Sequence, residues 1–279
     1  MNKNIPLAMA LSLLNWQAIA NDMEHTLVTG SYAPLAELTA SASVLESAEI
    51  QALNKRSLAE VLQTLPGLLV EQQGGPGGLT AVSIRGAESN FTLVLLDGVP
   101  VNDPTNSRGG GFDFSNLNPA LVERIEVVRG AQSAVYGSDA LAGVINIITR
   151  RPTKGHEAQL AGEWGEDSFE NYNAGAQGQV GAWDYSLAYA YRDDGEPVPG
   201  STRQSDNARL RLGWSPAQGQ RLEFGYRYLD GDRTSYPEQG GGPDFAVTDD
   251  LDSSSYRDEV YALSWQSKLT ETWSSSLSI

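Results

Sequence analysis

Cysteine is absent from the 279 residues of this chain, and histidine occurs only twice. Disulfide frameworks, cysteine-ligated metal sites and thiol catalysis are therefore excluded. Basic residues are also scarce, because 19 Lys and Arg stand against 35 Asp and Glu, for a formal net charge of −16. A nucleic-acid binder needs a basic face to meet phosphates, so we expect no nucleic-acid partner. A hydrophobic content of 40% is too high for a disordered chain.

Long apolar runs are missing too, since none approaches the roughly 20 residues that cross a bilayer as a helix. The short apolar stretch Pro6–Leu14 follows the basic Lys3 and precedes the small-residue sequence Ala18–Ala20. This three-part pattern is typical of a secretory signal peptide. We predict that residues 1–20 are such a peptide, cleaved after about Ala20; a buried N-terminal helix is the alternative.

Residues 40–152 have the pattern of a small domain that mixes helices and strands. Ser57 and Glu60 form a capping-box pattern, which predicts a helix over 58–65 that ends at Pro66-Gly67. Glycine-rich breaks separate the apolar runs that follow. We predict strands over Leu68–Glu71, Ala81–Arg85, Thr92–Leu96, Val122–Val128 and Val144–Thr149.

After Pro152 the pattern changes to an alternation with a period of two. In Trp183–Tyr191 one face carries aromatic residues and Leu187, whereas the other carries small and charged residues. The same alternation returns in Arg209–Trp214 and Arg221–Tyr228. We predict seven antiparallel strands, joined alternately by tight turns and longer loops, over 157–165, 169–180, 183–192, 207–215, 220–230, 255–269 and 272–279.

Two architectures contain strands of this kind, the soluble β-sandwich and the transmembrane β-barrel. The polar face repeatedly carries Arg and Glu in mid-strand, which suits a water-filled interior. Aromatic residues recur near strand ends, as they do at membrane interfaces. The pattern therefore favours the wall of a transmembrane antiparallel β-barrel over residues 153–279, with the sandwich as the alternative.

Four stretches resemble TonB-dependent outer-membrane receptors. They are Glu24–Gly30, which looks like the family's TonB box; Ala81–Gly86 with Val94–Pro100; Val122–Gly130; and Ser133–Thr149. The resemblance covers residues 24–279. It implies a plug domain (α+β, with a small mixed sheet) over 40–152 inside a transmembrane antiparallel β-barrel, after a TonB box and linker over 21–39.

Barrels that hold a plug have about 22 strands, and seven strands close no such cylinder. The last strand would be an unpaired edge in lipid, which the bilayer does not tolerate. We therefore expect the chain to be the N-terminal part of a longer receptor.

The resemblance implies active transport of a scarce, large ligand across the bacterial outer membrane. TonB, an inner-membrane protein, would supply the energy by binding the box formed by Glu24, His25, Thr26, Leu27, Val28, Thr29 and Gly30. Vitamin B12 receptors look most similar within the family, through Ser133–Ala140, Gly74-Gly75 and Gly165–Tyr172. We expect cobalamin or a related corrinoid as the ligand, and a ferric siderophore or haem as the alternative.

An outer-membrane enzyme or an adhesion barrel is a more distant alternative. The two histidines, His25 and His156, lie near no Ser/Asp pair that the sequence identifies, and the HExxH and GxSxG motifs are absent. We therefore expect no enzymatic activity.

The family's plug loops imply the positions of ligand contacts in this sequence. Gln73, Leu79 and Thr80 fall in one such loop, and Asn106 and Ser107 in another. Ordinary exposed loop residues are the alternative interpretation. Arg85 and Arg129 are interpreted instead as partners of barrel carboxylates.

Carboxylates crowd the two predicted long loops, and oxygen ligands at this density suit Ca²⁺. Candidate ligands are Asp193, Asp194, Asp206, Asp244 and Asp249. Vitamin B12 receptors have a calcium-ligand stretch that Asp206 matches, although Ala208 stands where that family has an acid. Apart from such Ca²⁺ we expect no cofactor, and a solvated acidic rim is the alternative.

Overall fold

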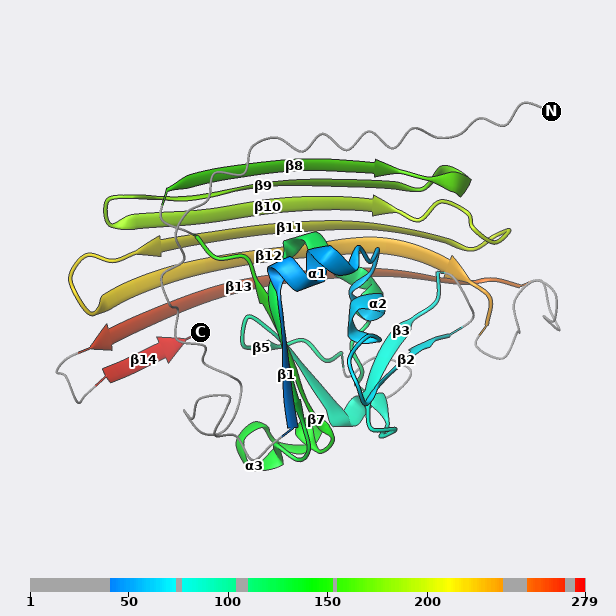
Figure 1. Ribbon diagram of the computed structural model, residues 1–279, viewed down its shortest axis with the longest axis horizontal. Helices are drawn as coiled ribbons and strands as arrows, with labels where there is room; N and C mark the ends of the chain where they lie inside the picture. The colour runs from blue at the N-terminus through cyan, green and yellow to red at the C-terminus, as the bar shows by residue number, and fades with distance from the viewer. Residues whose placement is uncertain are drawn as a thin grey trace. The chain divides into compact units, whose positions relative to one another are not determined.

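Figure 1 shows the computed structural model of the chain. The structure describes residues 41–73, 77–103, 110–152, 155–237, 250–268 and 274–278. The chain divides into two compact units, one with residues 21–150 and 236–249 and the other with residues 1–20, 151–235 and 250–279. We call them the mixed-sheet unit and the seven-stranded unit. Among the described residues, no helix has the length and apolar character needed to cross a membrane.

The mixed-sheet unit is built on a five-stranded sheet with the order β1-β6-β7-β4-β5. Strands β4 and β7 run parallel, and the other neighbouring pairs are antiparallel. Strands β2 and β3 form an antiparallel hairpin of their own. The strands are β1 Ser41–Glu46, β2 Leu68–Gln72, β3 Thr80–Ile84, β4 Thr92–Leu96, β5 Val99–Pro100, β6 Val122–Arg129 and β7 Gly143–Thr149. The α-helices are α1 Ser47–Leu53, α2 Leu58–Leu62 and α3 Ser133–Tyr136, and 3-10 turns cover Ser89–Phe91, Phe114–Asn116, Pro119–Leu121 and Ser138–Ala140.

The core of this unit joins helix α2 to one face of the sheet. Leu58, Val61 and Leu62 share one side of the helix, because residues three and four positions apart lie one above the other. All three are fully buried with Ile125 of β6 and Ile145 of β7 in one apolar cluster. Burying each such side chain contributes about 1.5–3 kcal/mol, so this cluster fixes the helix on the sheet.

Helix α2 begins as the capping box predicts. The Ser57 hydroxyl accepts a hydrogen bond from the backbone N–H of Glu60 at 3.2 Å. The helix ends at Leu62, earlier than predicted, because the next amides bond three residues back, as Leu65 N–H does to the Leu62 carbonyl at 3.0 Å. This tighter turn leads into Gly67, whose φ of 76° suits glycine.

All five runs predicted as strands in this unit form strands, within one residue at either end. Strand β1 was not predicted, since Ser41–Glu46 alternates too weakly to indicate a strand. It pairs with β6 along the edge of the sheet, with Ser41 opposite Arg129. The longer strand β6, most of which is buried, supplies the partner on which this weak sequence forms a strand.

The seven-stranded unit is an antiparallel sheet in which each strand pairs with its neighbours in the chain, from β8 to β14 (Figure 1). Its strands are β8 His156–Trp164, β9 Glu170–Val180, β10 Trp183–Asp193, β11 Thr202–Trp214, β12 Gln220–Ser235, β13 Asp252–Lys268 and β14 Ser274–Ser278, and a 3-10 turn covers Glu166–Ser168. The seven strands that we predicted are all present.

The sheet has two ends that differ in their connections. Tight turns at 181–182 and 215–219 lie at one end, which we call the turn end. Connections 165–169 and 194–201 lie at the opposite end, where β12 also ends and β13 begins, and we call it the loop end. At the loop end β11 begins at Thr202 rather than at 207, and β12 continues to Ser235 rather than to 230. Residues predicted in loops there belong to strands.

Candidate functional site

One face of the seven-stranded sheet is apolar and exposed. Leu187 lies midway along β10, pairs with Leu210 of β11 and is 47% exposed. The face continues through Tyr226 of β12, which pairs with Tyr261 of β13. The other large exposed residues on this face are Leu160, Trp164, Val180, Trp183, Tyr189, Leu212, Trp214, Leu263, Trp265 and Leu277. A contiguous apolar patch of this extent marks a surface that contacts protein or lipid.

Aromatic rings border this apolar face at both ends. At the turn end Trp183 stacks on Trp214 with ring centroids 5.5 Å apart. At the loop end Trp164 meets Tyr172 edge to face at 5.5 Å, and Tyr172 stacks with Tyr191 at 6.1 Å. Two aromatic belts flanking an apolar band are typical of a transmembrane β-sheet.

The opposite face of the sheet carries a network of charges near the turn end. Arg221 of β12 donates to both carboxylate oxygens of Asp184 on β10, at 2.6 and 3.0 Å. Arg221 also donates to Glu223 at 2.9 Å, and Arg211 of β11 pairs with the same carboxylate at 3.1 Å. Four charges thus join three strands on the face opposite the apolar one.

A glycine makes room for the ion pair between Asp184 and Arg221, which reaches across the intervening strand β11. Gly213 of β11 lies in register between Asp184 and Glu223, directly below the Asp184–Arg221 ion pair. A Cβ atom at Gly213 would overlap both the Asp184 carboxylate and the Arg221 guanidinium. The missing side chain lets an ion pair pass from β10 to β12 over the intervening strand.

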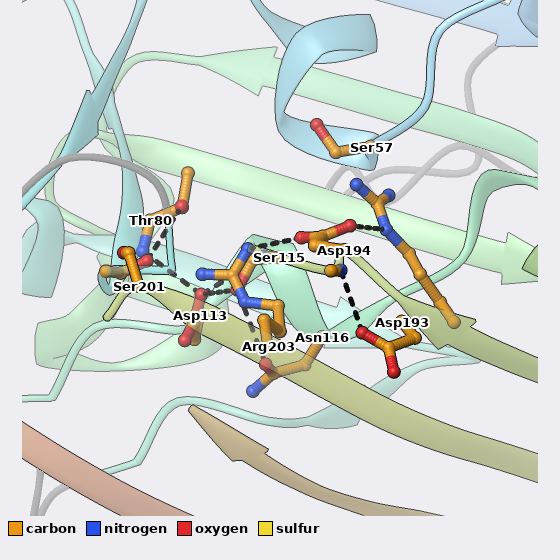
Figure 2. Close-up of polar contacts among 12 residues, drawn as sticks. Ser57, Thr80, Asp113, Ser115, Asn116, Asp193, Asp194, Ser201 and Arg203 are labelled. Atoms are coloured by element: carbon orange, nitrogen blue, oxygen red, sulfur yellow. Dashed lines mark hydrogen bonds and ion pairs between the residues drawn. The ribbon is translucent and has the colours of Figure 1, made fainter. Parts of the chain in front are cut away.

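In the mixed-sheet unit, the predicted ligand loop lies at the tip of the β2–β3 hairpin. Thr80 is buried, and its backbone N–H donates at 3.1 Å to Asp113, which also accepts from the Ser115 hydroxyl at 2.5 Å (Figure 2). The Gln73 N–H donates to the Leu79 carbonyl at 3.0 Å. The side-chain nitrogen of Gln73 is buried without a hydrogen-bond partner among the described residues. Thr80 thus has a structural role, while Gln73 and Leu79 hold the hairpin tip.

Two arginines of the mixed-sheet unit lie close together. Arg129 is 6% exposed, and it donates to the Pro66 carbonyl at 2.8 Å and to the Ser43 hydroxyl at 2.9 Å. Burial, and then the positive charge of Arg85, lower the pKa of Arg129 from its ordinary value. No carboxylate of the described residues pairs with either arginine. The predicted pairing with barrel carboxylates therefore stays a prediction.

Asp193 and Asp194, both predicted as calcium ligands, lie where β10 ends (Figure 2). The Asp193 carboxylate accepts from the Gly195 N–H at 2.8 Å and from the Gln204 side chain at 2.6 Å. Asp194 accepts from Arg192 at 2.5 Å and lies 3.7 Å from a guanidinium nitrogen of Arg203. Both carboxylates are therefore engaged by groups of the protein itself.

The predicted loop position of Asp206 is wrong. Asp206 lies in β11, because this strand begins at Thr202, and its side chain accepts a hydrogen bond from the Tyr189 hydroxyl. No group of three or more His, Asp or Glu side chains in the described part of the chain is placed to hold a metal ion. The other two candidate ligands, Asp244 and Asp249, lie outside the described residues.

Two further sets of predicted residues also lie outside the described part of the chain. They are the TonB-box residues Glu24–Gly30 and the second set of ligand contacts, Asn106 and Ser107.

The mixed-sheet unit has a counterpart among known protein families. Residues 34–144 match the family model described as "TonB-dependent Receptor Plug Domain". This segment has the plug-domain fold. The match spans the sheet strands from β1 to the start of β7, together with helices α1 to α3.

Solved structures resemble the plug domain together with the strands that follow it. The FpvAI–pyocin S2 complex gives a TM-score of 0.75 at 18% identity, over 87% of this chain and 34% of that chain. The siderophore receptor PiuA from Acinetobacter baumannii gives 0.69 at 20% identity, over 89% and 37%. Pseudomonas aeruginosa FpvA, bound to a heterologous pyoverdine and Fe, gives 0.68 at 20% identity, over 85% and 33%.

The chain spans about a third of the length of these structures. At such identities they show a shared fold. The predicted fold class, a plug domain with a mixed sheet followed by seven antiparallel strands, is confirmed by the plug-domain match and by this likeness.

Sequence reasoning missed the charge network of Asp184, Arg211, Arg221 and Glu223 as a unit. Its members alternate correctly for the polar face, but only the strand register shows which of them meet. Gly213 is the signal in the sequence that could have indicated this network, since a glycine inside a strand often marks a close approach of other groups.

Proposed function

We propose that this protein is a TonB-dependent receptor of the bacterial outer membrane that imports a ferric siderophore and is not an enzyme. The observation that carries the proposal is a plug domain followed in the chain by a sheet with one apolar and one charged face. In such a receptor the apolar face contacts lipid and the charged face lines a water-filled interior.

The dimensions of the apolar face support a position in a membrane. At about 3.3 Å per residue and a tilt of about 45°, β10 rises by about 19 Å between Trp183 and Tyr191. This distance, with the rings at its two borders, is close to the apolar band of about 25 Å in outer-membrane barrels. Lipid offers no hydrogen bonds to an open edge, so we propose that further strands close the sheet into a barrel.

The names of the similar structures support the proposed ligand. One is described as a siderophore receptor, and another is bound to pyoverdine and Fe. They support a ferric siderophore, which was our alternative expectation, over cobalamin. Cobalamin is kept as the competing ligand, because Ser133–Ala140 and Gly165–Tyr172 resemble vitamin B12 receptors.

The proposed energy source is TonB, bound through Glu24–Gly30. This segment is competent to form a strand, so it would add edge-on to a strand of its partner. Ca²⁺ is a subsidiary hypothesis. Of its five predicted ligands, Asp193 and Asp194 are bound by groups of the protein itself, and Asp206, Asp244 and Asp249 are the remaining candidates.

A binding experiment tests the ligand. The protein in detergent micelles is titrated with ferric catecholate and ferric hydroxamate siderophores, with cyanocobalamin and with each iron-free siderophore, and tryptophan fluorescence is followed. We expect saturable binding of a ferric siderophore with a Kd below about 1 μM and weaker binding of its iron-free form. Binding of cyanocobalamin alone would make cobalamin the ligand instead.

A further inference from the structure

The connection 194–201 between β10 and β11 is held by its own side chains. The N–H of Gly195 donates to Asp193, and the N–H of Gly200 donates to the Glu196 carboxylate at 2.5 Å. The Asp194 N–H donates to the Arg203 carbonyl at 2.9 Å, which closes the base of the connection. These bonds fix the connection at its base and near its far end.

This connection also contacts the one between β8 and β9. The Glu196 N–H donates to the Asp167 carbonyl at 3.0 Å. Gly195 packs so closely on Asp167 that a Cβ atom would overlap the same carbonyl. Asp167 has a φ of 57°, a left-handed conformation that turns its backbone here. Connections 165–169 and 194–201 are thus joined through two backbones.

On its other side the connection is tied to β12 and to the residues before β13. The Thr234 hydroxyl donates to the Gly200 carbonyl at 2.8 Å and accepts from the Thr202 N–H at 3.2 Å. A Cβ atom at Gly200 would meet a methyl carbon of Leu251 at 2.6 Å. All these residues belong to the seven-stranded unit.

We propose that residues 194–201 form a strap that holds the connections of the loop end together without a metal ion. The carboxylates of Asp193, Asp194 and Glu196 act inside the strap, where they bind backbone N–H groups, an amide and guanidinium groups. A loop that is tied at both flanks has fewer conformations to lose when a ligand binds. The strap therefore keeps the loop end ordered before any ligand arrives. Whichever ligand the protein carries, this inference is unaffected.

Gly195→Ala tests the strap, with Gly181→Ala as the matched control. Both glycines have left-handed φ values, 65° and 60°, so alanine strains the two backbones alike. A Cβ atom at Gly181 meets nothing within 4 Å, whereas at Gly195 it overlaps Asp167. Amide hydrogen exchange of the protein in detergent micelles, with Ca²⁺ and with EDTA, is the measurement.

We expect exchange in Gly195→Ala to become at least about tenfold faster in both 165–169 and 194–201, and to stay unchanged there in Gly181→Ala. Wild-type exchange in 165–169 and 194–201 should be the same in Ca²⁺ and in EDTA. The strap is overturned if 165–169 keeps its wild-type exchange in Gly195→Ala, or if EDTA alone loosens the wild-type connections.

Thr234→Val is a second variant that tests the other flank with little change in volume. It removes the hydroxyl that joins Gly200 and Thr202 to β12. We expect faster exchange in 200–202 with the rest of β11 and β12 unaffected, and unchanged exchange in 200–202 would overturn this part of the strap. A ligand-binding failure in any variant with normal exchange would bear on the proposed function alone.

Discussion

Gly213 shows what a single missing side chain does on the charged face of the sheet. It lies below the ion pair of Asp184 and Arg221, which spans from β10 to β12. Two charges with good hydrogen-bond geometry on a wet face stabilise a structure more than an ordinary surface pair. The residue thus contributes to strand register through the space that it leaves open.

Gly213→Ala should therefore destabilise the protein by about 1–3 kcal/mol, because the new Cβ atom forces the ion pair apart. The measurement is thermal unfolding in detergent. Gly225→Ala is the matched control. Gly225 lies in β12 on the same face of the sheet as Gly213, and a Cβ atom there would meet Ala262 at an ordinary 3.7 Å. Equal losses in the two variants would show that the space above Gly213 has no special role.

Local residue patterns could be predicted and distant ones could not. The Ser57–Glu60 capping box forms as predicted, because both partners lie within one helical turn. The loop position of Asp206 was mispredicted, because it depends on where β11 begins and on pairing with the neighbouring strand, which carries Tyr189. Which partner such a side chain meets is decided by the pairing register between neighbouring strands, and the sequence of one strand does not contain that register.

At the scale of the element, each strand of the seven-stranded unit is defined by its two faces. β10 was predicted within one residue, since its alternation of aromatic and small residues is strong. β1 was missed, because its place in the sheet is decided by pairing with β6. Strands β11 and β12 were predicted too short, because their polar loop-end residues resemble a loop.

Leu187→Arg tests which face contacts lipid. Leu187 lies midway between the two aromatic belts on the exposed apolar face, where an arginine should cost about 2–4 kcal/mol in a bilayer. The measurement is unfolding in lipid vesicles by denaturant. We expect a lower midpoint than for the wild type.

The control for this test is Gln177→Arg on the charged face of β9. Gln177 already donates to Glu157 at 2.9 Å, so an arginine there gains a partner and should change stability by less than about 0.5 kcal/mol. If the two variants lose the same stability, the apolar face does not contact lipid.

At the scale of the whole molecule, a segment with the plug-domain fold is followed in the chain by the seven-stranded sheet. Strand β1 lies at the edge of the plug sheet and is the first described strand after the proposed TonB box. Tension on the preceding segment would therefore reach the plug through an edge strand, which has a single hydrogen-bonded neighbour, β6. The sequence predicted this organisation through the resemblance of its plug motifs, and the ligand was the part that these motifs did not determine.

Uptake of radioactive iron by cells that carry this protein tests the central claim most directly. Cells with the wild type, and cells with a variant that lacks Glu24–Gly30, are given the ferric siderophore that binds the purified protein. We predict that the wild type accumulates iron, and that the variant binds the siderophore at the surface but accumulates none above background. Equal accumulation with and without this segment would contradict the account.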